Sequence, residues 1–323
     1  MSPFQLPKKL KNLPEAALKF INSLIFIKSA STETIRSYEL DLVQAFALPR
    51  HVLTKCNAGV GKIISTEGPP PHLPCLELLE VCRAALTRWS SLAPASRNRK
   101  AATLKSFLGW LYEEGAIERD LALQIHAPKV PHRLPHHISV DEALALLRYL
   151  ETQNNISALL VVLLLYGAGL RVSEVCNLKW SQVAADGRTL RVVGKGGKER
   201  ITALPPKGAK VLLEVRAQNK HSELVFGNAG AGGLTTRKAY DIVRDSGARA
   251  GLLQALHPHA LRHSFATHLL SSGANLRTLQ ELLGHSTLQA TQRYTHLGID
   301  QLARTLEDFH PLSDASSKKN RRT

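Results

Sequence analysis

Six side chains of this 323-residue chain could take part in one chemical step, and none of them is a carboxylate. They are two arginines, a lysine, two histidines and a tyrosine: Arg171, Lys195, His259, Arg262, His285 and Tyr294. Arg171 follows an apolar stretch in the turn GAGLRVSEV, where Glu174 can hold its guanidinium from three residues away. His259 and Arg262, at i and i+3 in PHALRHSFATHLL, share a helix face. Lys195 lies among glycines in VVGKGGKER, a turn that suits a group moving toward a ligand.

This set has the composition that phosphoryl transfer to a side chain requires in the absence of a metal. Two guanidiniums can clamp the non-bridging oxygens of a phosphate and neutralise the charge that develops on them. A lysine can protonate a leaving alkoxide, and an imidazole can accept the proton of a phenol, whose ordinary pKa is about 10. Each residue alone is ambiguous, so the inference depends on the whole set.

Tyr294 is the candidate nucleophile, although its spacing also fits packing. Ala290, Tyr294 and Leu297 recur at helical spacing, which is typical of a buried helix face. Residues 286–289 read S-T-L-Q, a capping box that begins a new helix, so His285 lies in the joint before it. The five partners elsewhere in the chain favour a nucleophile over a tyrosine that only packs.

Three histidines in the same region also suggest a metal site: His257, His259 and His263. Metal-dependent phosphodiester chemistry generally uses carboxylates for hard cations, or a mixture of His and Asp for zinc. Residues 246–299 contain a single acid, Glu281. We therefore expect no metal and no cofactor, and activity that survives EDTA would exclude a metal-dependent nuclease.

The charge of the chain predicts a polyanionic partner. Lys and Arg total 42 against 26 acidic residues, a formal net charge of +16, and both halves of the chain are basic. Nucleic acid is the first candidate and an anionic membrane surface the second. The longest apolar stretch, residues 154–170, is too short to span a bilayer and predicts a buried helix. Cys56, Cys75, Cys82 and Cys176 lack metal-ligand spacing, which is typical of reduced thiols in a cytosolic protein.

A mainly α-helical chain with a small β-sheet is expected to position these residues. The N-terminal segment has the spacing of an amphipathic helix, with Ala17, Ile21 and Leu24 on one face, and no targeting character. Helical patterns continue to Asp308 and are interrupted by TLRVVGKGGKERITAL, a hairpin with β-branched runs around a Gly-rich turn. We expect a helical domain, a Pro- and His-rich linker, a second domain and a disordered basic tail: 1–125, 126–139, 140–310 and 311–323.

Basic side chains outside the set of six are candidates for DNA contact. Arg97, Arg99 and Lys100 crowd the start of a helix, where positive charge opposes the helix dipole. Local stability does not explain them, whereas a phosphate partner would; the alternative is a solvated run of charges. The expected DNA contacts are Arg36, Arg97, Arg99, Lys100, Lys198 and Arg200.

The motifs GAGLRVSEV, VVGKGGKER, PHALRHSFATHLL and LLGHSTLQATQRYTH, in this order and spacing, resemble those of the tyrosine site-specific recombinases of the phage integrase family, nearest to the Xer branch. The resemblance is dense over residues 136–300 and looser over TIRSYELDL and SRNRKAATLKSFLGWLYEEG. All six candidate positions carry the residue types of the family. The Gly/Pro-rich stretch 49–76 departs from the compact N-terminal domain of Xer proteins.

The resemblance implies a role for each of the six residues. Tyr294 would attack the phosphate, form a 3′-phosphotyrosyl bond to DNA and release a 5′-hydroxyl. Arg171 and Arg262 would form the phosphate clamp, and His285 would be a further phosphate ligand. Lys195 would be the general acid and His259 the proton-transfer partner.

The same resemblance implies a fold and partners. A SAM-like helical core-binding domain and a mixed α/β catalytic domain would form a clamp around duplex DNA. Strand exchange would take place in a tetramer, of one recombinase or with a paralogue, without ATP. The Xer branch implies resolution of chromosome dimers at cell division, a septal DNA translocase as a possible partner, and action on the nucleoid in the cytoplasm. A helix over 299–309, with Ile299, Leu302 and Leu306 on one face, is expected to dock onto a neighbouring protomer.

Other functions fit parts of the sequence. An integrase of a mobile element, or a type IB topoisomerase-like enzyme, is the nearest alternative, and the integrase would share all of the chemistry. A catalytically silent DNA-binding paralogue would be equally basic, but the intact set of six residues counts against it. The metal-dependent nuclease is the last alternative.

Overall fold

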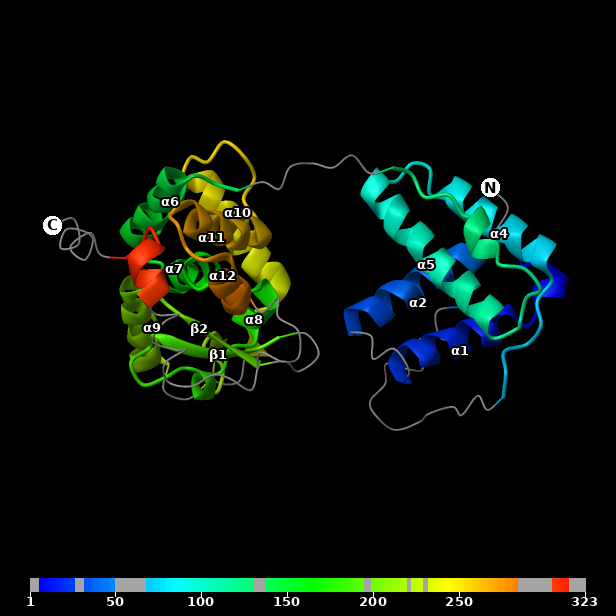
Figure 1. Ribbon diagram of the computed structural model, residues 1–323, viewed down its shortest axis with the longest axis horizontal. Coiled ribbons are helices and arrows are strands. Elements are labelled where there is room, and N and C mark those ends of the chain that lie inside the picture. The colour runs from blue at the N-terminus through cyan, green and yellow to red at the C-terminus, as the bar shows by residue number, and fades with distance from the viewer. Residues whose placement is uncertain are drawn as a thin grey trace. The chain divides into compact units, whose positions relative to one another are not determined.

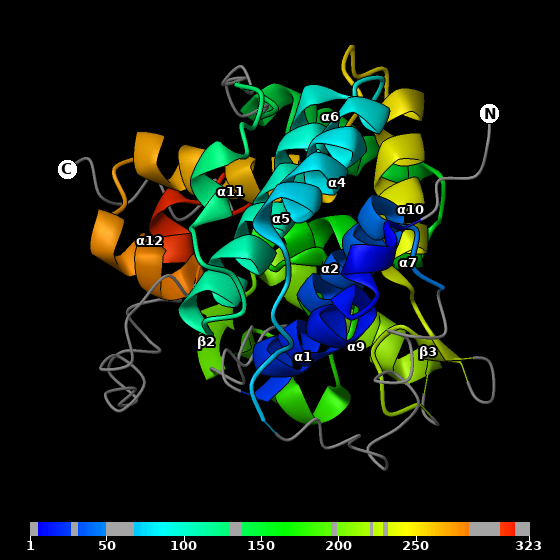
Figure 2. The same cartoon turned by 90° about the vertical axis from the view of Figure 1, so that its right-hand side faces the viewer.

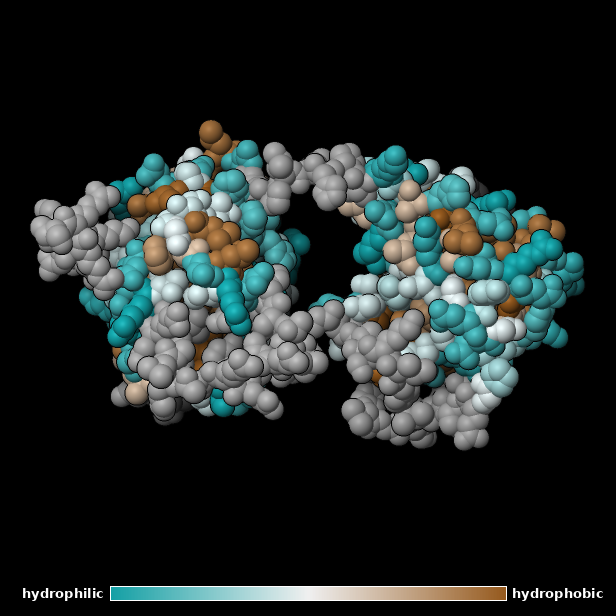
Figure 3. Space-filling model, in the orientation of Figure 1, coloured by the Kyte–Doolittle hydropathy of each residue, from teal (hydrophilic) through white to brown (hydrophobic). Residues whose placement is uncertain are grey.

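A computed structural model of the chain describes residues 6–26, 32–49, 68–129, 137–194, 199–219, 222–228, 232–283 and 304–313. The chain forms two compact units that divide between Arg133 and Leu134, within the range expected for the linker. The described residues are mainly helical, and their strands belong to the second unit (Figure 1). The prediction of a mainly α protein with a small β-sheet is confirmed. Hydrophilic residues cover much of the visible face of each unit, with apolar patches between them (Figure 3).

The described part of the N-terminal unit consists of helices. They are η1 (Lys8–Leu10), α1 (Leu13–Phe26), α2 (Thr32–Phe46), α4 (Cys75–Arg88), α5 (Pro94–Glu113) and η3 (Leu121–Gln124). Ala17, Ile21 and Leu24 of α1 are buried, as the spacing of the N-terminal segment predicts. Within this unit, α5 packs against α1, α2 and α4 (Figure 2). The rings of Phe20 and Phe107 meet in its core with 5.3 Å between centroids.

The second unit combines helices with short antiparallel strands. Its elements are α6 (Val140–Thr152), α7 (Ile156–Val162), the π-helical turn η4 (Leu163–Gly167), α8 (Val172–Cys176), η5 (Trp180–Gln182), β1 (Thr189–Val193), β2 (Glu199–Ala203), α9 (Pro206–Gln218), β3 (Gly227–Asn228), β4 (Gly232–Gly233), α10 (Thr236–Arg249), α11 (Pro258–Ser271) and α12 (Leu276–Leu283). In the described ranges, β1 pairs with β2 and β3 with β4.

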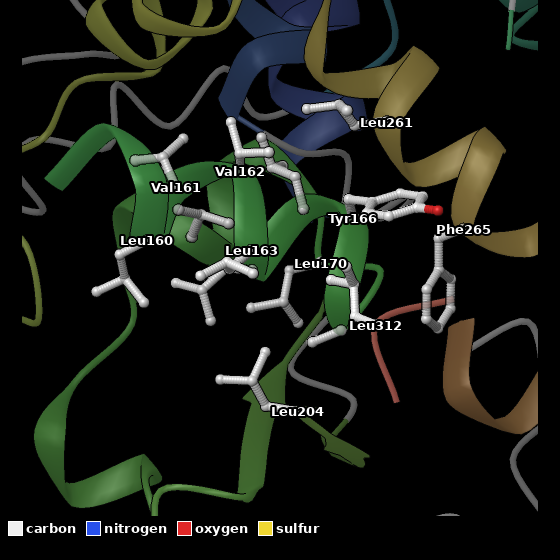
Figure 4. Close-up of a cluster of buried hydrophobic side chains, with 14 of the residues drawn as sticks. Leu160, Val161, Val162, Leu163, Tyr166, Leu170, Leu204, Leu261, Phe265 and Leu312 are labelled. Carbon is white, nitrogen blue, oxygen red and sulfur yellow. The ribbon is translucent and has the colours of Figure 1, made fainter. Parts of the chain in front are cut away.

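Helix α7 and the turn η4 form the buried centre of the second unit. Residues 158–166 are all buried, and Figure 4 shows Leu160, Val161 and Leu163 of this segment among side chains from other elements, including Leu204 and Phe265. The prediction of a buried helix within 154–170 is therefore confirmed for α7 and η4, although the last turn is π-helical. Along the part of the chain that the structure covers, no helix has the length and apolar character needed to cross a membrane.

The predicted hairpin is also confirmed. β1 and β2 are antiparallel, with Val192 opposite Arg200. Leu190 and Val192 are buried while Arg191 and Val193 are exposed, so one face of the hairpin packs inward. Arg200 lies on that inward face.

The C-terminal segment packs against its own unit. Residues 304–309 are helical, and Leu306 and Leu312 belong to the core around α7. His310 is fully buried, and its Nε2 lies 3.1 Å from the carbonyl oxygen of Tyr166. Because Leu312 and Ser313 are buried, the expected boundary between domain and tail at 310/311 is wrong, and the packed domain extends at least to Ser313.

The expected docking of 299–309 onto a neighbouring protomer stays a prediction. Ile299 and Leu302 lie outside the described residues. Leu306, the third member of the apolar stripe, is occupied by contacts within its own unit, so its docking elsewhere would first require release from this core.

Candidate active site

Glu174, in α8, is the carboxylate at the centre of the described part of the site. Its side chain accepts a hydrogen bond from the backbone N–H of Arg171 at 2.7 Å and one from the guanidinium at 2.9 Å. The guanidinium of Arg200 donates one hydrogen bond to each carboxylate oxygen, at 2.6 and 2.7 Å. Nη1 of Arg262 lies 3.9 Å away. The prediction that Glu174 holds Arg171 is confirmed, and the same acid gathers two further arginines.

Glu174 is ionised in this setting. Burial raises the pKa of its carboxyl, but hydrogen bonds and charge from Arg200, followed by hydrogen bonds from Arg171, outweigh burial. The pKa therefore lies below its ordinary value, and the carboxylate remains charged when it orients the arginines.

Arg262 enters the cluster from α11 and is 9% exposed. Its guanidinium donates to the carbonyl of Gly169 and, at 2.8 Å, to the carbonyl of Leu283 at the end of α12. Burial, and after it the charges of Arg171 and Arg200, lower the pKa of Arg262 to about 9. The cluster is thus strongly positive, and an anion that entered it would favour the charged form of Arg262.

The turn GAGLR brings Arg171 beside α11. Gly169 has φ of +63°, a region that glycine adopts without strain, and a Cβ at this position would lie 2.6 Å from the ring of Phe265. On the preceding turn η4, Tyr166 Oη shares a hydrogen bond of 2.8 Å with Nδ1 of His268 in α11. These contacts hold the turn against α11. Arg171 and Arg262, which are far apart in sequence, therefore both lie close to Glu174.

The three histidines near the start of α11 have separate environments. His257 caps the helix, since its Nδ1 accepts a hydrogen bond from the amide of Ala260 at 3.0 Å. The ring of His263 lies edge-on to that of His137, with 5.9 Å between centroids. Burial, followed by the charge of His137, lowers the pKa of His263. His259 is exposed in the first turn. Within the described ranges, no three His, Cys, Asp or Glu side chains converge to hold a metal.

Four of the predicted site residues lie outside the described residues: Lys195, Lys198, His285 and Tyr294. The first two belong to the connection between β1 and β2, and the others follow α12 in the sequence. The elements that precede or follow these segments in the sequence include β2 and α12. Arg200 links these two, because its Nε donates a hydrogen bond to the carbonyl of Leu282 in α12 at 3.0 Å.

A second group of buried charges lies in the N-terminal unit. Asp41, in α2, is fully buried and accepts two hydrogen bonds from Arg99 at 2.6 and 2.8 Å, one from Lys100 at 2.8 Å and one from Thr103 at 2.9 Å. A buried acid on another helix therefore accounts for Arg99 and Lys100 without a phosphate, an explanation that local spacing did not offer, and their contact with DNA stays a prediction.

The remaining candidates for DNA contact differ in exposure. Arg36 is exposed on α2 and Arg97 is partly exposed on α5, whereas Arg200 is only 5% exposed. Contact with DNA stays a prediction for each of them.

Asp41 and the pairing of Arg200 with Glu174 were not predicted from the sequence. One signal was available for Arg200: it shares the alternating inward face of β2 with Thr202, which is also buried. An arginine on the buried face of a strand requires an internal acid. Glu174 was already identified as a partner of Arg171, but its pairing with a second arginine was not predicted.

Comparison with known proteins identifies the class of this site. The phage integrase family matches residues 136–299, about half of the chain, and this range contains the Glu174 cluster. The chain belongs to the phage integrase family of tyrosine site-specific recombinases.

The similarity to individual proteins extends beyond residues 136–299. The tyrosine recombinase XerC of Myxococcus xanthus is 33% identical over 88% of this chain and 93% of its own length. The tyrosine recombinase XerD of Listeria innocua is 32% identical over 90% of this chain and 97% of its own length. The similarity therefore includes the N-terminal unit.

Solved structures agree in fold. The XerH site-specific recombinase bound to its difH substrate has a TM-score of 0.58 at 19% identity, covering 93% of this chain and 96% of that one. A lambda integrase tetramer bound to a Holliday junction has a TM-score of 0.60 at 17% identity, covering 87% of this chain and 76% of that one.

Proposed function

We propose that this chain cuts and rejoins DNA at specific sites through a covalent bond between Tyr294 and a 3′-phosphate. The observation that carries the proposal is the cluster in which Glu174 gathers the guanidiniums of Arg171 and Arg262. This cluster lies within the region matched by the phage integrase family. Two such guanidiniums can bind both non-bridging oxygens of one phosphodiester.

In the first half-reaction, the phenolic oxygen of Tyr294 attacks phosphorus while the bond to the 5′ oxygen breaks. His259 accepts the phenolic proton, and Lys195 donates a proton to the leaving 5′ oxygen. Arg171 and Arg262 stabilise the charge of the phosphorane. One phosphoester bond forms for each one broken, so no nucleotide is consumed.

In the second half-reaction, the 5′-hydroxyl of a partner strand attacks the phosphotyrosine and releases Tyr294. The same proton transfers run in reverse, as microscopic reversibility requires. His285 contributes a further contact to the phosphate in both steps. The electrostatic work is done by side-chain cations, and the reaction needs neither a metal nor another cofactor.

DNA binding draws on the net charge of +16. Arg36 and Arg97, which are at least partly exposed on the N-terminal unit, are proposed to contact phosphates and thus position the duplex without specifying its sequence. The N-terminal unit and the catalytic unit are each proposed to contact DNA.

The biological setting is proposed from the relatives. Proteins named XerC and XerD are similar to this chain over most of its length, and the lambda integrase neighbour was solved as a tetramer on a Holliday junction. A tetramer of this chain, alone or with a paralogue, would resolve chromosome dimers at cell division, acting on the nucleoid in the cytoplasm. A septal DNA translocase is the proposed further partner.

The test is capture of the covalent intermediate. The wild-type chain first selects its binding sequence from a random duplex pool, and a nicked duplex with this sequence then serves as a suicide substrate. We expect an SDS-resistant protein–DNA adduct that forms equally well in EDTA. Tyr294→Phe should bind the duplex but form no adduct.

Tyr149→Phe is the matched control. Tyr149 packs against the core of the same unit, so loss of its hydroxyl should leave the adduct intact. An undiminished adduct in Tyr294→Phe would contradict the proposal.

A further inference from the structure

Arg200 is a buried arginine whose described hydrogen bonds all lie within the protein. It is 5% exposed. Two nitrogens of its guanidinium bond both oxygens of Glu174 at 2.6 and 2.7 Å, and Nε donates to the carbonyl of Leu282 at 3.0 Å. One side chain thereby joins β2, α8 and the end of α12.

Glu174 creates an electrostatic difficulty in a site that binds phosphate. Its carboxylate lies 2.9 Å from a guanidinium nitrogen of Arg171 and 3.9 Å from one of Arg262. A negative charge so close weakens the attraction that these two arginines exert on a phosphodiester, and burial limits its screening by water and salt. A carboxylate can orient the clamp only if another cation balances its charge.

We propose that Arg200 is this balancing cation, a positioning residue that neutralises Glu174 and fixes it against the end of α12. Glu174 can then orient Arg171, while Arg171 and Arg262 retain their charge for the DNA phosphate. The inference rests on the proposed function, because it assigns a phosphate to the space that the clamp faces.

The charge balance supports this role. Three guanidiniums and one carboxylate give the cluster a net charge of +2. A phosphodiester carries one negative charge, and a phosphorane that develops two would be neutralised by the cluster. Without Arg200 the net charge would be +1, so that part of the charge developing in the transition state would have no counter-charge.

A double-mutant cycle tests the proposal on the selected suicide duplex described above. The measured quantity is the single-turnover rate of adduct formation for wild type, Arg200→Met, Glu174→Gln and the combination of both. Arg191→Met is the matched control, because Arg191 lies on the exposed face of the same hairpin and belongs to neither the clamp nor its partners.

We expect Arg200→Met to form the adduct at least about tenfold more slowly than wild type, since it leaves Glu174 unbalanced beside the phosphate. The double variant should be faster than Arg200→Met, because it removes the unbalanced carboxylate as well. Arg191→Met should match wild type. A double variant that is no faster than Arg200→Met, or a wild-type rate in Arg200→Met, would overturn the proposal.

The salt dependence of DNA binding separates this role from direct contact of Arg200 with DNA. The double variant keeps the net charge of wild type, so a balancing cation predicts an unchanged slope of log affinity against log salt. Loss of a phosphate contact would reduce the slope by about 0.9 and would overturn the proposal. The double variant replaces a buried ion pair with a neutral pair, which usually preserves folding, so the slope decides the question even if Arg200→Met does not fold.

Failure of the proposed function gives a different result. If wild type itself forms no adduct, the proposed function fails, and this inference fails with it. If wild type forms the adduct and the cycle shows no rescue, only the role of Arg200 is wrong.

Discussion

Glu174 is both buried and ionised, so the site depends on its three arginines as much as they depend on it. A buried carboxylate is unfavourable unless hydrogen bonds and opposite charges compensate it. Arg200 supplies the largest compensation and Arg171 the next. Loss of the charge at this one position would therefore affect both the stability of the second unit and the orientation of the clamp.

Glu174→Gln should destabilise the chain near pH 7 by roughly 3 kcal/mol, because it leaves buried guanidiniums without their acid. The folded pKa of Glu174 is lowered, so its contribution is complete above the ordinary pKa of a glutamate and is lost as pH falls through the folded value. Urea unfolding should thus show a constant difference from wild type between about pH 5 and 7 that shrinks in acid.

Glu223→Gln is the control for that comparison. Glu223 pairs with Lys179 at 2.8 Å on the surface, and exposed pairs contribute about 0–1 kcal/mol. A difference between wild type and Glu174→Gln that does not change with pH would show that the pKa of Glu174 is the same in the folded and unfolded states, which would contradict the lowered pKa.

At the scale of elements, the turn between η4 and α8 determines where Arg171 lies. Gly169 permits the left-handed backbone and the close approach of Phe265. Its carbonyl accepts a hydrogen bond from Arg262, so the packing of the turn and the geometry of the clamp depend on the same residue.

Gly169→Ala should lower the free energy of unfolding by roughly 2–4 kcal/mol, the sum of left-handed strain and a ring displaced from its packed position. Gly251→Ala is the matched control, because Gly251 also has positive φ (+81°) but no atom within 4 Å of an added Cβ. It should lose only about 1 kcal/mol. Equal losses by urea denaturation would contradict the close packing assigned to Gly169.

Local sequence patterns predicted the helices and the hairpin, but they did not predict the contacts between residues far apart in the sequence. The β-branched runs around a Gly-rich turn identified the hairpin, and the i,i+3 spacing identified Glu174 as a partner of Arg171, because both depend on neighbours in sequence. The ion pairs of Asp41 with Lys100 and of Glu174 with Arg200 join residues 59 and 26 positions apart. Such pairs are fixed by the packing of whole elements, which spacing alone does not specify.

At the scale of the whole molecule, each unit has its own hydrophobic core. One core lies among the helices of the N-terminal unit and the other surrounds α7. The described clamp residues all belong to the second unit, while both halves of the sequence are basic. The geometry of the clamp is therefore expected to depend on the second unit, whereas both units are expected to contribute to DNA affinity.

A fragment of residues 134–323 should fold alone, with a single cooperative thermal transition, because a domain with its own core can fold independently. Its affinity for the selected duplex should be lower than that of the full chain, and its salt slope smaller, since the phosphate contacts of the N-terminal unit are absent. Calorimetry and fluorescence anisotropy would measure both. A fragment without a cooperative transition, or with the full salt slope, would contradict this division of roles.

Tyr294 is proposed to carry the covalent bond to DNA. The most direct measurement is mass spectrometry of the wild-type adduct after nuclease and trypsin digestion. The chain has six tyrosines, and cleavage after Arg293 and Arg304 isolates Tyr294 in the peptide YTHLGIDQLAR. We expect a nucleotide 3′-phosphate on Tyr294 in this peptide, whereas a nucleotide on any other residue would rule out Tyr294 as the nucleophile.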